Sequence, residues 1–291
     1  MDPSGAPGAT FVLPRPSELV LGRRRFDLAR RALVMGILNR TPDSFYDQGR
    51  YFALDALIDH GASLVEAGAD ILDIGGVKAG VGPEVPIEEE LDRVVPVVEA
   101  LSARFDVALS VDTWSAEVAA ACFAAGAVLG NDISGFSDPR YLEVAAAAGA
   151  GVVATHIRLR PRVLDPNPTY PGGDVVGAVE SYLSDRRARA LAAGIPAESI
   201  ILDPGLDLGK STPQSLELLR ASDRFAALGP LFLASSNKDF LGELFALPVT
   251  ERSDATLAAC AVGVLLGCRV LRVHNVAGTR ALVDTLAALL P

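Results

Sequence analysis

Eight short apolar runs along this chain each end in a polar or charged residue, and most of the intervals between them have helical character. In chain order the endings are Asn39, Asp73, Asp112, Asn131, His156, Asp203, Ser235 with Lys238 just beyond, and Arg272 with His274. A strand followed by a helix, repeated eight times, predicts a (β/α)8 TIM barrel of the α/β class. Because such a barrel carries its site at the carboxyl ends of its strands, the eight endings should converge on one pocket.

The intervals between the apolar runs contain no linker, so we expect one domain over residues 19–291. The proline- and glycine-bearing residues 1–18 predict a flexible N-terminal lead-in. Arg23, Arg24 and Arg25, followed by Phe26, predict a small hairpin that closes the bottom of the barrel. Helices are expected at residues 53–67, 87–103, 115–125, 139–148, 175–193, from 212 onward, at 256–266 and at 276–290.

Composition narrows the possible partners. A net charge of −10 and a pI of about 4.8 argue against a broad surface for nucleic acid or an anionic membrane. Cys122, Cys260 and Cys268 have no metal-ligand spacing, which predicts reduced core residues in a cytoplasmic protein. No segment resembles a secretory signal or a membrane span, so any anionic ligand must be bound by locally placed cations.

Helix capping is the alternative explanation for polar strand endings, because Asp, Asn and Ser often begin the helix after a strand. Capping fits Asp70, Ser115 and Asp138. It does not fit the cationic and imidazole endings, which are poor N-caps and costly to bury without a partner. Those endings are His156, Lys238, Arg272 and His274.

The endings form two chemical groups. Acceptor oxygens and an amide suit a neutral, nitrogen-rich heterocycle with several N–H donors; these are Asp112, Asn131 and Asp203. Cations beside an amide, on the neighbouring first and last strands, suit a phosphate-like anion; these are Asn39, Arg272 and His274. With Lys238 between the two groups, the residues predict a barrel that binds a heterocycle joined to an anion.

Several segments resemble the dihydropteroate synthase family, in order, from about Leu21 to the C-terminus. The most specific are the first motif and the Arg272-Val273-His274 ending, and the others agree in order and spacing. The segments are Ile37-Leu38-Asn39-Arg40-Thr41-Pro42-Asp43-Ser44-Phe45, Asp73-Ile74-Gly75-Gly76, Ser110-Val111-Asp112-Thr113, Asn131-Asp132-Ile133-Ser134-Gly135, Asp203-Pro204-Gly205 through Gly209-Lys210, and Ser236-Asn237-Lys238-Asp239-Phe240.

The resemblance implies an enzyme that joins a dihydropterin pyrophosphate to p-aminobenzoate and releases pyrophosphate, with Mg²⁺ on the phosphates. Carried over by position, the pterin would be held by Asp112, Asn131, Asp203 and Lys238. The pyrophosphate would be held by Asn39, Arg272 and His274, with Asn39 near the metal. The family also implies a homodimer through the last helices.

The same residues suggest how the reaction would be helped. If the C–O bond breaks early, a cationic pterin forms, and Asp112 and Asp203 would stabilise it electrostatically. Together with Lys238 these are the candidate catalytic residues. Arg272, His274 and Mg²⁺ would take up the charge that grows on the leaving group.

The chain departs from the family in the loops expected to bind the second substrate. Loop 2 usually reads Gly-Glu-Ser-Thr-Arg-Pro-Gly, but here it reads Gly76-Val77-Lys78-Ala79-Gly80-Val81-Gly82. Loop 7 usually reads Ser-Arg-Lys-Ser, but here Asn237 and Asp239 replace the arginine and the last serine. Arg40 replaces a small apolar residue, and Asp207 replaces a glycine. A carboxylate at position 239 would repel the p-aminobenzoate anion by on the order of 1 kcal/mol.

These departures favour a divergent paralogue that keeps the pterin and pyrophosphate sites but has weak or lost activity with p-aminobenzoate. In that case Arg40, Lys78, Asn237 and Asp239 form the rim for an unidentified amine. Three alternatives stay open: an ordinary dihydropteroate synthase in which Asp239 only caps a helix, a non-catalytic pterin-binding protein, and a pterin-binding methyl transfer domain. The pyrophosphate residues argue against the last of these.

Overall fold

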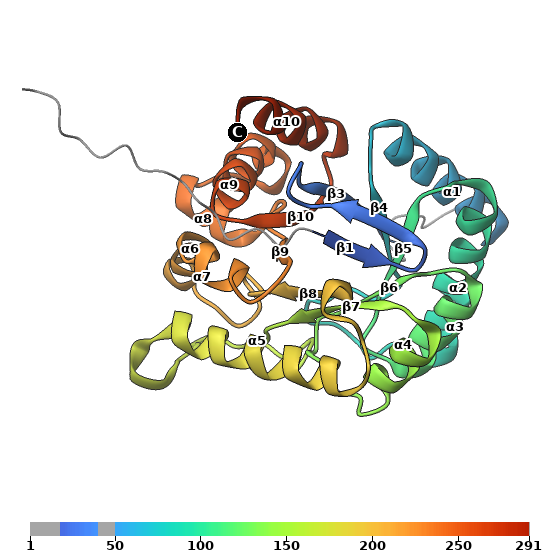
Figure 1. The fold of residues 1–291 in the computed structure, drawn as a ribbon, viewed down its shortest axis with the longest axis horizontal. Coiled ribbons are helices and arrows are strands. Elements are labelled where there is room, and N and C mark those ends of the chain that lie inside the picture. The colour runs from blue at the N-terminus through green and yellow to red at the C-terminus, as the bar shows by residue number, and fades with distance from the viewer. Residues whose placement is uncertain (1–17, 40–49, 291) are drawn as a thin grey trace, which may run out of the picture.

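The predicted barrel is present in the computed structural model, which describes residues 18–39 and 50–290 (Figure 1). Within these residues eight parallel strands form a closed barrel in the order β10-β3-β4-β5-β6-β7-β8-β9. The strands are β3 (Leu33–Asn39), β4 (Ile71–Gly75), β5 (Ala108–Asp112), β6 (Leu129–Asp132), β7 (Gly151–Thr155), β8 (Ile200–Asp203), β9 (Leu231–Leu233) and β10 (Cys268–Val273). The expected lead-in, residues 1–18, lies outside the described residues except for Glu18, which begins the first strand. Arg40 also lies outside the described residues.

Helices surround the strands, as the intervals in the sequence predict. They are α1 (Arg50–Glu66), α2 (Ile87–Arg104), α3 (Ala116–Ala125), α4 (Tyr141–Ala148), α5 (Val175–Ala192), α6 (Thr212–Arg220), α7 (Ser222–Ala226), α8 (Asp239–Phe245), α9 (Ser253–Leu265) and α10 (Val276–Leu289). The short helix α7 was not predicted, and α8 was expected only in the alternative in which Asp239 caps a helix, because five to seven residues carry too little periodicity. Short 3-10 segments lie at η2 (Pro171–Gly173), η3 (Ala197–Ser199) and η4 (Val249–Glu251).

An antiparallel hairpin closes the amino end of the barrel, as predicted. It consists of β1 (Glu18–Leu21) and β2 (Arg24–Asp27), and β1 lies over the centre of the ring of strands (Figure 1). Leu19 and Leu21 are fully buried against the side chains that fill the barrel interior, among them Met35 and Phe232. The hairpin turns at Gly22, whose φ of +58° and close approach to Val128 exclude a side chain. Among the described residues, the hairpin therefore covers the amino end of the barrel interior.

The three residues proposed as helix caps differ in their hydrogen-bond partners. Ser115 caps α3 by accepting the N–H of Val118 at 3.4 Å, as expected. Asp138 accepts the N–H of Arg140 at 3.0 Å, just before α4, and also the N–H of Ala116 at 3.1 Å, at the start of α3. Asp70 caps no helix: its carboxylate accepts the N–H of Val34 at 2.9 Å and binds Arg31 and Arg280.

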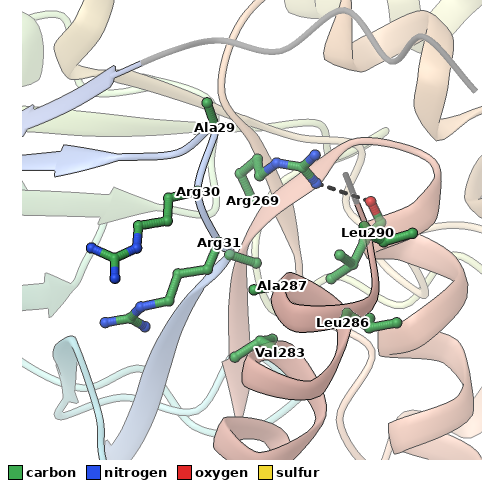
Figure 2. Close-up of a pocket in the computed structure, with 10 residues that line it drawn as sticks. Ala29, Arg30, Arg31, Arg269, Val283, Leu286, Ala287 and Leu290 are labelled. Carbon is green, nitrogen blue, oxygen red and sulfur yellow. Dashed lines mark hydrogen bonds between the residues drawn. The ribbon is translucent and has the colours of Figure 1, made fainter.

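A small pocket lies at the amino end of the barrel, between the segment before β3 and helix α10 (Figure 2). Its volume is about 40 Å³, and its lining includes Arg30, Arg31 and the buried Arg269. Arg269 donates to the carbonyl oxygens of Val264 and Cys268, both at 2.9 Å. Its size and its position away from the strand carboxyl ends make it a structural feature of the barrel, not a substrate site.

The hairpin should contribute measurably to stability. Replacing Leu21 by Ala leaves a cavity at the closed end of the barrel, so we expect the free energy of unfolding to fall by about 2–5 kcal/mol. Urea unfolding measures this change. Arg23→Ala, in the exposed hairpin turn, is the control and should alter stability by less than about 0.5 kcal/mol. Equal effects of the two substitutions would show that the hairpin does not close the core.

Candidate functional site

The barrel brings the predicted site residues to one end because all eight strands run in parallel. Asn39, Asp112 and Asp203 are the last residues of β3, β5 and β8, and Asn131 lies near the end of β6. Arg272 is the last but one residue of β10 and His274 follows that strand directly. Lys238 lies five residues beyond β9 and is the residue before α8.

A network centred on Arg272 joins four of the strands. The guanidinium donates from Nε to Oδ2 of Asp73 at 2.6 Å and from Nη2 to Oδ2 of Asp112 at 2.8 Å. Asp73 is fully buried and also accepts from Asn131 Nδ2 at 2.9 Å and Ser110 Oγ at 2.6 Å. The two groups of endings that the sequence separates, heterocycle and anion, are thus held together by one arginine.

Asn39 also reaches this network. A side chain at Gly75, on the intervening strand β4, would meet Asn39 Oδ1 at 2.8 Å and Asp112 Cβ at 3.5 Å. Glycine at this position therefore lets the first and third strands of the barrel bring an amide and a carboxylate close together. The sequence assigned no binding role to Asp73 or Gly75, although Asp73 was one of the eight endings.

The protonation state of Asp112 is set mainly by burial. Burial and the carboxylates of Asp73, Glu90 and Asp132 raise its pKa to about 7, while Arg272 acts in the opposite direction. Its raised pKa means that Asp112 binds a proton more strongly in the folded chain than in the unfolded chain. This residue therefore reduces stability as the pH rises from about 4 toward 7.

Asp203 and Lys238 are the other two residues predicted to bind the pterin, besides Asp112 and Asn131. Asp203 Oδ1 accepts the N–H of Gly205 at 2.7 Å, and its Oδ2 accepts from Thr155 Oγ1 at 3.4 Å. Lys238 Nζ donates to the carbonyl of Leu206 at 2.5 Å. Burial raises the pKa of Asp203 and lowers that of Lys238, and in each case the opposite charge of the other residue partly offsets the effect of burial.

His156 takes part in a separate contact that the sequence did not reveal. Lys210 is buried, and its Nζ lies 2.8 Å from His156 Nδ1 and donates to the carbonyls of His156 and Leu208 at 3.1 and 3.0 Å. Burial and the lysine charge lower the pKa of His156 to about 3, so the imidazole is neutral. These contacts attach loop 6, the segment between β8 and α6, to the end of β7.

Loop 7 is held by Arg252 of the turn before α9. Its Nη1 donates to the carbonyl of Asn237 at 2.8 Å and to Asp239 Oδ1 at 2.9 Å. The Asp239 side chain is 83% exposed and lies in the first turn of α8. His274 Nδ1 lies 2.9 Å from Ser236 Oγ and 3.5 Å from Asn237 Nδ2. The negative charge expected to repel p-aminobenzoate is therefore offset by an ion pair.

Loop 2 is held by Arg162 of loop 5, the segment between β7 and α5. The Arg162 N–H donates to the carbonyl of Ala79 at 3.2 Å, and its guanidinium donates to the carbonyls of Lys78 and Pro83 at 3.4 and 2.6 Å. On the other side, Arg93 Nη1 donates to the carbonyl of Gly76 at 2.7 Å. Arg162 and Arg93 together fix the course of loop 2.

No ready-made metal cage accompanies these residues. Among the described residues, no three histidine, cysteine, aspartate or glutamate side chains are grouped so that they could hold a metal ion. Mg²⁺ commonly keeps several waters and binds through one or two protein oxygens together with substrate phosphates. Asn39 Oδ1, close to Asp112 across Gly75, is compatible with that limited kind of donor set.

The described part of the chain also contains no helix with the length and apolar character that a bilayer crossing requires.

Arg272 should be needed to bury two carboxylates together. In Arg272→Met, Asp73 and Asp112 lose their common cation, and we expect a loss of about 3–5 kcal/mol in the free energy of unfolding at pH 8. The loss should shrink near pH 5.5, since the raised pKa of Asp112 allows it to be protonated there.

Urea unfolding of the wild type and the variant at both pH values measures this effect. Arg272→Met with Asp73→Asn serves as the matched control and should recover part of the loss. A loss that is the same at both pH values would contradict the proposed charge balance.

Comparisons with known proteins agree with this geometry. Residues 35–274 match the family described as pterin binding enzyme. The chain is 45% identical over 266 residues to inactive dihydropteroate synthase 2 of Mycobacterium tuberculosis, covering 89% of this chain and 83% of that protein.

Solved structures give the same result. The chain resembles Yersinia pestis dihydropteroate synthase in a sulfonamide drug complex, with a TM-score of 0.86, 38% identity and coverage of 94% of this chain and 98% of that one. It also resembles Xanthomonas albilineans dihydropteroate synthase with 4-aminobenzoic acid, with a TM-score of 0.85, 38% identity and coverage of 95% and 99%. The chain therefore belongs to the pterin binding enzyme family, as a relative of the dihydropteroate synthases.

Proposed function

We propose that this chain is a divergent dihydropteroate synthase paralogue that binds a dihydropterin pyrophosphate and has weak or lost activity with p-aminobenzoate. The observation that carries the proposal is the network in which Arg272 binds both Asp73 and Asp112, and Asn131 donates to Asp73. This network holds the predicted pterin residues and the predicted pyrophosphate residues together. Loops 2 and 7, in contrast, lack the side chains with which the family is expected to bind the second substrate. The mycobacterial relatives named inactive dihydropteroate synthase 2 support the same conclusion.

In this proposal the pterin lies at the carboxyl ends of the strands, within reach of Asp112, Asn131, Asp203 and Lys238. Carboxylate and amide oxygens accept from the ring N–H groups, and the lysine and amide donate to ring acceptors. A carboxyl group with a pKa near 7 can hold a proton from the ring or release it at neutral pH. The buried carboxylates also favour a ring that becomes positively charged as the reaction proceeds.

Arg272, His274 and Asn39 would hold the pyrophosphate. The Arg272 side chain is only 18% exposed and is already fixed by two carboxylates, so a bound anion would meet a cation in a set orientation. Mg²⁺, when bound, would supply further positive charge on the phosphates, and Asn39 would help to hold it. During transfer the C–O bond to pyrophosphate breaks, a C–N bond to the amine forms, and the amine loses a proton.

The second substrate is where the chain has diverged. Asn237 replaces an arginine, and Lys78 and its neighbours in loop 2 replace two hydroxyls and an arginine of the family. The ion pair of Asp239 with Arg252 shifts the main cause of weak p-aminobenzoate binding from repulsion to the loss of these partners. We therefore propose a different, unidentified amine, or binding of the pterin without turnover, at a rim formed by Arg40, Lys78, Asn237 and Asp239.

We also propose that the protein forms a homodimer through its last helices and that it is cytoplasmic. Val262 and Leu265 of α9 and Leu289 of α10 are exposed apolar residues that such an interface would cover. Sedimentation velocity measures the assembly, and the mass of a single chain at micromolar concentration would rule the dimer out.

The direct test measures binding and turnover separately. Titration calorimetry with dihydropterin pyrophosphate and Mg²⁺ should show saturable binding, and Asp112→Asn should weaken it at least tenfold. Turnover of the bound compound with p-aminobenzoate should be slow or absent. Turnover with p-aminobenzoate at the rate of an ordinary synthase would refute the divergence, and failure of the pterin compound to bind would refute the proposal as a whole.

Restoring the family residues in loop 7 should improve recognition of p-aminobenzoate. Asn237→Arg with Asp239→Ser adds a cation and removes a carboxylate, and we expect the affinity for p-aminobenzoate to rise about fivefold or more in the presence of pyrophosphate and pterin. Asp254→Ser, which removes an exposed carboxylate from the first turn of α9, is the matched control. An unchanged affinity in the loop 7 variant would show that loop 7 is not the cause of the divergence.

A further inference from the structure

Asp207 of loop 6 has an unusual backbone conformation for a residue with a side chain. Its φ is +65°, in the left-handed region that favours glycine. Glycine is also the residue that Asp207 replaces relative to the family, so a carboxylate stands on a backbone that does not favour it. Strain of this kind persists where the surroundings hold the residue, and it is concentrated at functional sites. The contacts of Asp207 therefore indicate what the carboxylate does.

The polar groups of Asp207 are engaged, and they join loop 6 to two helices. Its N–H donates to Ser215 Oγ at 3.2 Å, and Ser215 Oγ donates to its Oδ1 at 3.2 Å. Its Oδ2 accepts the N–H of Phe240 at 3.2 Å, and its carbonyl accepts the N–H of Gly209 at 3.1 Å. Ser215 of α6 and Phe240 of α8 are fully buried, and the two helices contact one another (Figure 1).

The peptide group between Leu206 and Asp207 carries a contact with Lys238. The N–H of this group is bound to Ser215, and its carbonyl, which belongs to Leu206, accepts from Lys238 Nζ at 2.5 Å. Because a peptide group is planar, holding the N–H also sets the direction of the carbonyl. Leu206 is itself buried, so the ammonium group meets an acceptor in a fixed position.

Asp207 also holds the segment from which the lysine projects. Lys238 directly precedes α8, and an ammonium group cannot accept a hydrogen bond from the first turn of that helix. The N–H of Phe240, in this first turn, is bound by Asp207 instead. A carboxylate is also favourable at the positive end of a helix. Asp207 thus acts on the lysine at two places, on its backbone at the start of α8 and on its ammonium group at Leu206.

The charges around Lys238 depend on Asp207 as well. Burial lowers the pKa of Lys238, while the carboxylates of Asp203 and Asp207 raise it. Arg272 adds to the effect of burial, and Lys210 of loop 6 is a further basic group close to these carboxylates. The second carboxylate therefore helps the ammonium group to stay charged, which a glycine at position 207 could not do.

We propose that Asp207 is a positioning residue for the pterin site, which orients the Lys238 ammonium group through the Leu206 carbonyl and through the start of α8. The inference rests on the proposed function in one respect, the assignment of Lys238 to the pterin. A glycine at position 207 could supply the peptide contacts but not the carboxylate. The substitution thus changes how firmly the lysine is held, without changing a group that touches the pterin.

The position of the lysine can be tested without a ligand. The chain contains three lysines, Lys78, Lys210 and Lys238, so selective ¹³C labelling of lysine Cε gives three NMR signals, each assigned by a single Lys→Met variant. In Asp207→Gly we expect the Lys238 signal to move toward that of lysine in an unstructured peptide, while the Lys78 signal stays in place. Asp207→Asn tolerates the left-handed conformation and keeps an acceptor oxygen, so it should retain the signal near its original position. An unchanged Lys238 signal in Asp207→Gly would overturn the proposal.

A double-mutant cycle relates this position to ligand binding. The affinity for dihydropterin pyrophosphate, measured by titration calorimetry, should fall about fivefold in Asp207→Gly and less than about twofold in Asp207→Asn. In a Lys238→Met background Asp207→Gly should cause no further loss, because Asp207 acts through the lysine. Asp223→Asn, which removes an exposed carboxylate from the first turn of α7, is the control and should bind as the wild type does. Thermal unfolding of each variant checks that it is folded.

Two outcomes of the cycle contradict the proposal. Unchanged affinity in Asp207→Gly would show that the carboxylate does not serve the pterin site. An equal loss in the presence and in the absence of the lysine would show that Asp207 acts on loop 6 and not through Lys238. If the wild type does not bind the pterin compound, the proposed function fails, and the lysine signal alone decides whether Asp207 positions Lys238.

Discussion

The candidate site depends on a single arginine that neutralises carboxylates from two strands. Arg272 of β10 contacts Asp73 of β4 and Asp112 of β5, and Asp73 in turn holds Asn131 of β6. Carboxylates this deeply buried could not stay charged without such a partner. The arginine therefore determines how much charge the pocket carries and in which orientation a cation is available to an anionic ligand.

The fold could be predicted from the sequence because its signal is repetitive. Each strand is a short apolar run, each ending is polar, and a parallel barrel brings all such endings together. The hairpin was also predictable, since a basic turn with flanking apolar residues marked it. The short helix α8 was foreseen only in the alternative in which Asp239 caps a helix, and Lys238, expected just beyond the seventh strand, directly precedes it.

The partners of the site residues were less predictable than the residues themselves. Arg162 and loop 2 lie some 80 positions apart along the chain, and no periodicity links them. The ion pair between Asp239 and Arg252 was also hidden, so sequence reasoning assigned to Asp239 a repulsion that the structure reduces. Lys210 was visible as part of a motif, but its contact with His156 depends on how loop 6 folds back on β7.

The contacts of Arg162 with loop 2 bear on how this chain could diverge. All of them end on backbone carbonyl oxygens, those of Lys78, Ala79 and Pro83, and every residue type supplies such an oxygen. These three contacts thus depend little on the side chains that carry the carbonyls, whereas position 82 must stay glycine because a Cβ there would meet the Arg162 guanidinium. Substitutions could accumulate at positions 78 and 79 and alter what the barrel recognises, while the contacts of Arg162 stayed in place.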